Sequence, residues 1–411
     1  MPSPVNPPRG MRDFLPVEKR RRDRVLATIR DVYRSYGFDE IETPVVEDSA
    51  RLHSGLGGDN EKQVFAVLRR GLDVDDLRKA GAPLDLADLG LRFDLTVPLA
   101  RFYASHRAEL PAVFRAVQVA PVWRAERPQK GRYRQFVQCD IDVLGEAGPL
   151  AEIELLTATT AALDALGLTG THVRVNDRRV LLGLLASWGV APDATDCALV
   201  VVDKLDKIGV DGVAAELVEL GVPVDVSATA LRQLADADWT LTDAPWLDRA
   251  AFAELEALRD AVPGVDLRFD PTLVRGMGYY TGTIFEVAHP DVPYSLGGGG
   301  RYDGMIGRFL GQDVPAAGFS LGFERLVDLV DLAAGDAADG LVLLHDRQVP
   351  PAALARLRTD ALRRHGRVRL DRRAKNVGVQ LAGLAALGYA SFAFVRTGDE
   401  TLDELEVKPV A

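Results

Sequence analysis

The chain has 411 residues, of which 47% are hydrophobic and 27% are charged. This composition excludes a disordered or collagen-like chain, and the length predicts two to three domains. With 49 Lys and Arg against 60 Asp and Glu, the net charge is −11, which excludes a basic coat over the whole surface, so any contact with nucleic acid must be local.

A helix and a strand are predicted near the N-terminus. Residues 17–36 place apolar side chains at three- and four-residue spacing, which indicates an amphipathic helix that ends at Gly37. Residues 38–43 then predict a strand that stops at Pro44, because proline has no N–H for a strand ladder.

Short apolar strands are predicted over residues 91–126, where three prolines interrupt the pattern. Within this segment, Asp94 and Thr96 are expected on one face of a strand, because alternate side chains of a strand point the same way. Taken alone, these two side chains favour nothing beyond a structural ion pair.

A β-hairpin with a long polar loop is predicted over residues 123–142. Its second strand alternates cleanly, so that Gln138, Asp140 and Asp142 lie on one face and apolar side chains, including Cys139, lie on the other. Polar side chains along a strand face need a wet cleft or a ligand. This face is therefore a candidate binding surface, and Cys139 is predicted to belong to the core.

The same hairpin is rich in cations. Arg124 and Glu126 share a face of its first strand, and five Lys or Arg residues lie within the eleven positions 124–134. Arg side chains bind phosphate and carboxylate groups through paired N–H donors. On charge alone, a solvated basic loop is an equally good interpretation.

Helices are predicted in the middle of the chain. Residues 150–166 have the pattern of a single helix, and residues 178–260, rich in Ala, Leu and Val, are predicted to form a helical insertion. Strand and glycine signals return over residues 265–325.

Two glycine-rich motifs fall within this last region. In LVRGMGYYTGTIFEV, residues 273–287, glycines surround a Tyr pair, and Arg275 lies where a loop enters the sheet. In SLGGGGRYDGMIGRF, residues 295–309, four glycines permit close approach of a ligand to the backbone. Neither motif has the spacing of a phosphate-binding loop or a dinucleotide fingerprint. Ordinary tight turns are the alternative interpretation of both.

A third motif, AAGFSLGFERL at residues 316–326, predicts a strand of small residues that leads into a helix. Glu324 and Arg325 lie in the first turn of that helix. An arginine on an otherwise apolar element needs a carboxylate or a phosphate as its partner. A structural ion pair is the default interpretation of this motif by itself.

The C-terminal segment, residues 341–411, alternates strands and helices in the order βαβαβ, which predicts a small and mostly parallel α/β domain. A linker is expected before it, at residues 333–340. The segment contains 12 Lys and Arg against 8 Asp and Glu. This local excess of positive charge indicates an anionic partner.

The cysteines and the termini bear on the compartment. Two cysteines, Cys139 and Cys197, give neither a disulfide framework nor a zinc ligand set, so no bound metal and a reducing, cytoplasmic compartment are expected. The N-terminal sequence lacks the apolar core of a signal peptide. No apolar run approaches the roughly 20 residues that span a bilayer, so no membrane partner is expected.

Together, these segments resemble the histidyl-tRNA synthetases, a family of class II aminoacyl-tRNA synthetases. FDEIETPVVE at 38–47, with the helix before it, is similar to motif 1, residues 123–142 are similar to motif 2, and residues 316–326 are similar to motif 3. LVRGMGYYTG and GGGGRYDG are similar to the two histidine-specific signatures of the family. PRGMRDFLP and VNDRR are further matches, and the resemblance covers about residues 1–330.

The resemblance implies an α+β protein with a known activity. A class II catalytic domain built on an antiparallel sheet would span residues 1–330, with the helical insertion at 178–260 inside it, and a shortened anticodon-binding-like α/β domain would span 341–411. The implied activity is that of a histidine–tRNA ligase, which activates L-histidine with ATP to histidyl-adenylate and transfers it to tRNA(His). A cytoplasmic homodimer that pairs through motif 1 is also implied.

The resemblance also implies which residues bind histidine: Asp94, Thr96, Arg124, Gln138, Asp142, Arg275, Tyr279, Tyr280 and Tyr302. Asp94, Thr96 and Gln138 would lie near the α-amino group. Asp142 and Tyr280 would face the imidazole, with the other two tyrosines beside them.

Three arginines are implied as catalytic residues: Arg124, Arg275 and Arg325. Arg124 would bridge the histidine carboxylate and the α-phosphate of ATP, Arg275 would contact the α-phosphate, and Arg325 the γ-phosphate. Together with Arg124 and Arg325, Glu126 completes the implied ATP site and would face the adenine. Mg²⁺ would bridge phosphate oxygens with few protein ligands.

Two other functions are compatible with the sequence. One is a non-catalytic, histidine-sensing paralogue, like the regulatory subunit of ATP phosphoribosyltransferase. The other is an adenylating paralogue that delivers histidine to an acceptor other than tRNA. The shortened C-terminal segment is the feature that favours the second of these.

Overall fold

The structure is a computed structural model that describes residues 5–53, 62–128, 132–223, 238–241, 243–275, 280–331 and 340–410. Contacts divide the chain into two compact units. The first unit comprises Met1–Arg12 and Val25–Val330, and the second comprises Asp13–Arg24 and Asp331–Ala411. Tyr279 and all but the last residue of the predicted linker lie outside the described residues.

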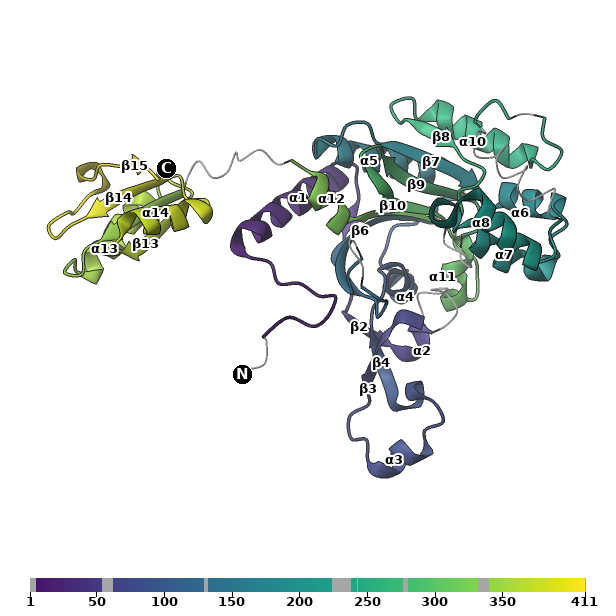
Figure 1. Cartoon of the computed structure of the whole chain (residues 1–411), viewed down its shortest axis with the longest axis horizontal. Helices are drawn as coiled ribbons and strands as arrows, with labels where there is room; N and C mark the ends of the chain where they lie inside the picture. Colours follow the sequence, from purple (N-terminus) through teal and green to yellow (C-terminus); the bar gives the residue numbers. More distant parts are fainter. Residues whose placement is uncertain are drawn as a thin grey trace. The chain divides into compact units, whose positions relative to one another are not determined.

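The first unit is built on an eight-stranded sheet in the order β1-β5-β6-β11-β10-β9-β7-β8 (Figure 1). The pairs from β5 to β7 are antiparallel, and the two end pairs, β1 with β5 and β7 with β8, are parallel. The strands are β1 (Asp39–Glu40), β5 (Phe114–Trp123), β6 (Gln135–Leu144), β7 (His172–Asp177), β8 (Leu267–Phe269), β9 (Thr283–His289), β10 (Val292–Arg301) and β11 (Ala316–Gly322). This sheet, with its helices, confirms the predicted α+β class.

The two faces of the sheet have different coverings. On one face α5 (Leu150–Ala165) packs on β6 and β11, and Tyr33 of α1 (Pro16–Ser35) lies near Cys139, which is fully buried as predicted. On the other face α4 (Thr96–His106) and α11 (Asp303–Leu310) pack together against the ends of β5 and β6. This second face carries the polar side chains of β6. α12 (Phe323–Leu329) follows β11 and contacts β6 and β10.

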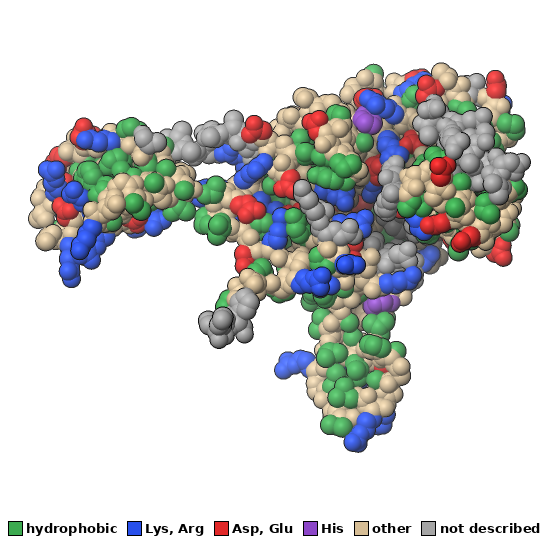
Figure 2. All heavy atoms as spheres, in the orientation of Figure 1, with side chains coloured by type: hydrophobic (Ala, Val, Ile, Leu, Met, Phe, Trp, Pro, Cys, Tyr) green, Lys and Arg blue, Asp and Glu red, His purple; other side chains and the backbone are tan. Residues whose placement is uncertain are grey.

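A three-stranded antiparallel sheet forms a separate arm of this unit. It consists of β2 (Val46–Asp48), β4 (Ala87–Leu91) and β3 (Phe65–Leu68), in that order, with short helices α2 (Ser49–Leu52) and α3 (Val74–Lys79) and a 3₁₀ turn at Pro83–Leu86. Exposed apolar side chains gather on the arm (Figure 2), and they include Leu68, Val74, Leu77 and Leu84.

The predicted strand that carries Asp94 and Thr96 is wrong. β4 ends at Leu91 and α4 begins at Thr96, so Asp94 lies in the connection, where its Oδ1 accepts a hydrogen bond from the N–H of Val97. Pro98 sits in the first turn of α4, where a backbone N–H has no partner within the helix, so proline is compatible with a helix there.

Two other strand predictions need correction. The strand expected over 38–43 is limited to Asp39–Glu40. Pro121, expected to interrupt a strand, lies inside β5 opposite Val137. Because β1 pairs with β5 only around Ala116, this part of β5 needs no N–H on that side, and proline is tolerated there.

The helical segment between β7 and β8 has its own apolar core. Its helices are α6 (Arg178–Ser187), α7 (Thr195–Val202), α8 (Leu205–Glu219) and α10 (Arg249–Ala261). Leu184, Leu199 and Leu217 are buried together in one cluster of this segment. None of the helices that the structure describes is long and apolar enough to cross a membrane.

The second unit contains the predicted βαβαβ order. β12 (Gly340–His345) pairs in parallel with β13 (Arg367–Arg372) and β14 (Ser391–Val395), and β15 (Lys408–Pro409) adds an antiparallel edge. The connecting helices are α13 (Pro351–Ala361) and α14 (Val377–Ala386). Lys and Arg side chains are exposed on this unit (Figure 2), among them Arg356, Arg363, Arg372 and Lys375.

Candidate active site

The polar face of β6 carries three buried hydrophilic side chains. Gln138, Asp140 and Asp142 are each less than a tenth exposed, and they alternate along the strand as the sequence predicts. Asp94 lies close enough for its charge to act on both β6 carboxyl groups. Three acidic side chains, those of Asp94, Asp140 and Asp142, therefore lie close together, and such an acidic cluster favours a cationic ligand.

Asp142 is held by Tyr302, whose hydroxyl donates to Oδ1 at 2.6 Å. Burial raises the pKa of Asp142 to about 7, although the hydrogen bond from Tyr302 acts in the opposite direction. Gly318 on β11 lies directly across from Asp142. The absence of a side chain at Gly318 leaves the room that this carboxyl group occupies.

Gln138 and Asp140 form a second polar group with Ser320 of β11. The Nε2 of Gln138 donates to Oγ of Ser320 at 3.0 Å and to the Asp140 carboxylate at 3.3 Å. Burial, followed by the charge of Asp142, raises the pKa of Asp140 well above its ordinary value, and a hydrogen bond from Ser320 opposes this shift.

Arginines converge beside this acidic cluster. Arg325 donates to the backbone oxygen of Ser295 at 2.5 Å, and burial together with the charges of Arg132 and Arg275 lowers its pKa. Arg124 donates to the backbone oxygen of Phe93 and is close enough to Asp140 to lower the pKa of that group. Arginines that repel one another create a site for an anion such as a polyphosphate.

Arg275 is held by a chain of ion pairs across the sheet. Its Nη1 pairs with Glu286 of β9 and donates to Oγ of Ser295 at 3.1 Å. Glu286 also binds Nη1 of Arg174 at 2.9 Å, and Arg174 in turn binds Asp270. These contacts therefore hold the Arg275 guanidinium group in place beside β9 and β10.

Glycine is required beneath this guanidinium group. A Cβ atom at Gly298 would lie 2.6 Å from Cζ of Arg275, and a Cβ atom at Gly318 would overlap Oδ1 of Asp142. Gly298 and Gly318 therefore make room for site side chains, and this is a more specific role than the general backbone access predicted from the sequence.

This geometry predicts that Gly298→Ala and Gly318→Ala impair different substrates. Alanine at 298 should displace Arg275 and slow chemistry on the phosphate, whereas alanine at 318 should displace Asp142 and weaken binding of the cationic substrate, each by roughly tenfold or more. Steady-state kinetics measures this difference, because it gives the rate of the reaction and the KM of each substrate for each variant. Gly264→Ala, where a Cβ atom meets nothing within 4 Å, is the control, and equal effects of both variants on both substrates would contradict the assignment.

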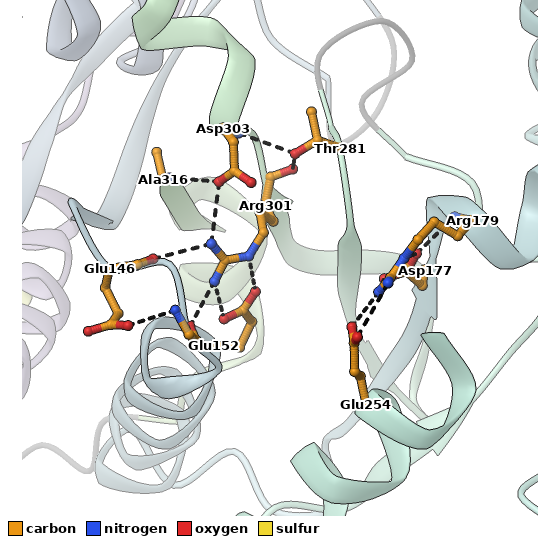
Figure 3. A network of polar contacts seen from close by, with 10 residues as sticks. Glu146, Glu152, Asp177, Arg179, Glu254, Thr281, Arg301, Asp303 and Ala316 are labelled. Carbon is orange, nitrogen blue, oxygen red and sulfur yellow. Dashed lines mark hydrogen bonds and ion pairs between the residues drawn. The ribbon is translucent and has the colours of Figure 1, made fainter. Parts of the chain in front are cut away.

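Arg301 fixes the segment that carries Tyr302 (Figure 3). Its guanidinium binds both oxygens of Glu152 at 2.6 Å and the backbone oxygens of Glu146 and Gly148. Asp303 accepts from Arg301 and from the N–H of Ala316. These contacts lock the backbone on both sides of Tyr302, so Arg301 and Asp303 have structural roles.

A separate ion-pair group in Figure 3 begins at the end of β7. Asp177 caps α6 and binds Arg179, which also binds Glu254 of α10. This group joins the helical segment to the sheet. The VNDRR motif, which contains Asp177 and Arg179, therefore has a structural explanation here.

The start of the chain also contributes to the site region. Arg12 pairs with Glu324 and lies over the Tyr133 ring, 3.5 Å from its centroid. Glu324 also accepts a hydrogen bond from the N–H of Val137. Glu324 thus joins α12 to the start of β6 and to the N-terminal segment. Arg325, for which the sequence predicted a carboxylate or phosphate partner, instead donates to the backbone oxygen of Ser295.

The remaining predicted residues lie around the two groups. Thr96 begins α4 beside Asp94, Tyr280 lies next to Gly300 of β10, and Glu126 pairs with Arg132 at 3.5 Å. Tyr279 lies outside the described residues.

Three residues near the site were not among those singled out from the sequence. Asp140 was predicted on the polar face of β6 but given no role, and Arg132 was counted only as one of the hairpin cations. No sequence pattern indicated Ser320, because its position opposite Asp140 depends on the pairing of β6 with β11.

Comparisons with known proteins agree on one family. A family profile described as Histidyl-tRNA synthetase matches residues 10–326. A protein of Leifsonia xyli subsp. xyli named histidine–tRNA ligase is 58% identical over 429 aligned positions, which cover all of this chain and 99% of that protein.

Solved structures give the same result for the fold. A histidyl-tRNA synthetase from Nostoc sp. PCC 7120 aligns with a TM-score of 0.77 and 26% identity, over 99% of this chain and 95% of that one. A Bacillus halodurans protein described as an ATP phosphoribosyltransferase regulatory subunit/histidyl-tRNA synthetase aligns with a TM-score of 0.77 over 97% of this chain and all of that one. At 21% identity, the second likeness concerns the fold alone.

Proposed function

Because the chain belongs to the histidyl-tRNA synthetase family and is thus an aminoacyl-tRNA ligase, we propose that it activates L-histidine with ATP and transfers it from histidyl-adenylate to tRNA(His). The observation that carries this proposal is the juxtaposition of the acidic cluster with the converging arginines. A bound amino acid has a cationic α-ammonium group and an anionic carboxylate, and ATP adds a polyphosphate. The two groups of side chains match these charges.

We assign the acidic cluster and the residues around it to histidine. Asp94, Thr96 and Gln138 would receive the α-ammonium group, and Asp142 would accept the imidazole N–H. Tyr280 and Tyr302, with Tyr279, would enclose the ring. The hydrogen bond from Tyr302 fixes the Asp142 carboxylate before a ligand arrives, and such preorganisation reduces the cost of binding.

We assign the arginines to the carboxylate and the phosphates. In adenylation, the histidine carboxylate attacks the α-phosphorus of ATP and pyrophosphate leaves, so two anions must approach each other. Arg124 and Arg275 would offset that repulsion and hold the charge that develops at the α-phosphorus. Arg325 would hold the γ-phosphate, and Glu126 would face the adenine.

No general base is required in this step, because the attacking carboxylate is already ionised at neutral pH. Mg²⁺ would enter with the ATP phosphates and offset part of their charge. Arg132, whose charge acts on Arg325, extends the arginine group toward the same phosphates.

The second unit is proposed to contact tRNA as an anticodon-binding-like domain. It has 12 Lys and Arg against 8 Asp and Glu over residues 341–411, in a chain whose net charge is −11. Its exposed arginines supply the phosphate contacts that such a domain needs. In this assignment residues 1–330 form the catalytic domain, with the helical insertion at 178–260 within it.

A homodimer in the cytoplasm is also proposed. β1, which belongs to the segment similar to motif 1, lies at the edge of the large sheet and has one strand partner, β5, among the described residues. An edge strand with a free side is a site for pairing with another chain. Light scattering coupled to size-exclusion chromatography would measure the mass in solution.

The activity is tested by two assays on the purified protein. We expect histidine-dependent exchange of pyrophosphate into ATP, and attachment of radiolabelled histidine to purified tRNA. No exchange above the control without histidine would contradict the enzymatic function and favour the histidine-sensing alternative. Exchange without charging of tRNA would favour an acceptor other than tRNA.

A further inference from the structure

The side-chain amide of Gln138 is bound on one side only. Its Nε2 donates to both oxygens of Asp140, at 3.4 and 3.3 Å, and to Oγ of Ser320 at 3.0 Å. Its Oε1 is buried and has no hydrogen-bond partner among the residues that the structure describes. A buried acceptor without a donor is unfavourable, so this oxygen is available for a donor that a ligand supplies.

Asp140 determines which end of the amide faces the ligand. Both oxygens of an ionised carboxylate only accept hydrogen bonds, and a protonated carboxyl group keeps one oxygen that accepts them, so Asp140 presents an acceptor to the amide in either state. Ser320 directs its hydroxyl hydrogen to Asp140, so it offers Gln138 only a lone pair. The NH₂ end of the amide must therefore face Asp140 and Ser320, and Oε1 must face the other way.

The pairing of β6 with β11 brings these groups together. Asp140 lies opposite Ser320 across the two strands, and Gln138 lies two residues earlier on the same face of β6. Gln118 of β5 lies opposite Asp140 on the other side, but its own amide is bound by Thr43 and the backbone oxygen of Leu95. The amide of Gln118 therefore does not compete with Gln138 and Ser320 for the Asp140 carboxyl group.

We propose that Asp140 is a positioning residue that, with Ser320, orients Gln138 so that its Oε1 accepts a hydrogen bond from the α-ammonium group of the bound amino acid. This inference rests on the proposed function. An ammonium group has three N–H donors and no acceptor, so an amide turned the other way would present N–H groups to N–H groups. Asp140 would therefore affect affinity for histidine without touching it.

Asp140→Asn is the variant that tests the orientation. Asparagine keeps the shape, but it can present an NH₂ group to Gln138 and so permit the amide to turn. We expect the dissociation constant for histidine, measured by calorimetry, to rise at least tenfold. The dissociation constant for imidazole-4-propionate, which keeps the imidazole and the carboxylate but lacks the amino group, should change less than twofold.

A double-mutant cycle separates action through Gln138 from a direct effect of the Asp140 charge. In a Gln138→Ala background the amide is gone, so Asp140→Asn should then add less than a twofold loss of histidine affinity. Ser320→Ala removes one of the two acceptors that hold the NH₂ end. Ser320→Ala should therefore also weaken histidine binding, but by a smaller factor than Asp140→Asn. It replaces Asp140→Asn as the test if that variant does not fold.

Several outcomes would overturn the inference. Equal weakening of both ligands would make Asp140 a structural residue, and full additivity with Gln138→Ala would mean that its charge acts directly on the ammonium group. An unchanged histidine affinity in Asp140→Asn would show that Asp140 has no role in histidine binding. Asp164→Asn, at an exposed position of α5, is the matched control. Failure of the proposed function is seen separately, as wild-type protein without histidine-dependent exchange.

Discussion

Arg275→Ala is expected to slow the formation of histidyl-adenylate by about 10²–10³-fold, while the KM for histidine changes little. Removal of one preorganised donor to a developing oxyanion costs roughly this much in other enzymes. Arg275 is suited to that role because Glu286 and Ser295 hold its guanidinium in place and Gly298 leaves room for it. The effect should therefore appear in the chemical step.

Single-turnover measurement of adenylate formation, with saturating histidine and ATP, checks this expectation. Arg268→Ala is the matched control, because Arg268 lies on β8 of the same sheet with its side chain half-exposed and paired with Asp266. An unchanged single-turnover rate in Arg275→Ala would show that Arg275 is structural. A large rise in the KM for histidine at an unchanged rate would place it in amino-acid binding.

Local sequence patterns were sufficient where a segment determines its own structure. The alternation over β6 correctly placed Gln138, Asp140 and Asp142 on one face, since a strand has a fixed two-residue period. The spacing of apolar side chains likewise gave the long helix α1 and the alternating elements of the second unit. Each of these depends on residues that are close together in the sequence.

The errors arose where one residue type is compatible with two structures. Prolines in the segment before β5 were interpreted as strand breakers, but Pro98 is in the first turn of α4, where proline is tolerated. Because Leu99, Ala100 and Tyr103 are buried at the three- and four-residue spacing of a helix, the apolar pattern already contained the signal for this helix. The correction moves Asp94 and Thr96 from a strand face to the connection before a helix and to its first residue, beside Asp140 and Asp142.

The interactions that organise the site could not be predicted from the sequence. The contact of Gln138 with Ser320 joins positions 182 residues apart, and the bond from Tyr302 to Asp142 joins positions 160 apart. Both depend on the register between β6, β11 and β10, which no local pattern specifies. The sequence could therefore indicate which residues carry charge, but not which neighbours orient them.

Burial of the Asp142 carboxyl group has a cost to stability. Burial raises the pKa of Asp142 from an ordinary 3.8 to about 7. The folded protein thus holds this proton more tightly than the unfolded chain does. The resulting stabilisation is fully present below about pH 4, declines as the pH rises, and is lost once the pH passes about 7.

Asp142→Asn is accordingly expected to have two opposite effects. Asparagine has no charge to ionise, so the free energy of unfolding of the variant relative to wild type should increase between pH 4 and pH 8 by about 4 kcal/mol, from a shift of about three pKa units. Denaturant titrations of both proteins across this range measure the difference. A difference that does not vary with pH would show that Asp142 titrates at its ordinary value in the folded protein.

The second effect is on substrate recognition. Asp142→Asn removes the charge that would accept the imidazole N–H, and its amide can turn a donor toward the ring, so the KM for histidine should rise on the order of 100-fold. The KM for ATP should stay unchanged, because the arginines that would bind the phosphates are untouched. Exchange kinetics at pH 8, where Asp142 is ionised and free imidazole is neutral, give both constants, with Asp164→Asn as the control. If only the KM for ATP changed, Asp142 would not be the partner of the imidazole, and the acidic cluster would have to be assigned to a different part of the substrate.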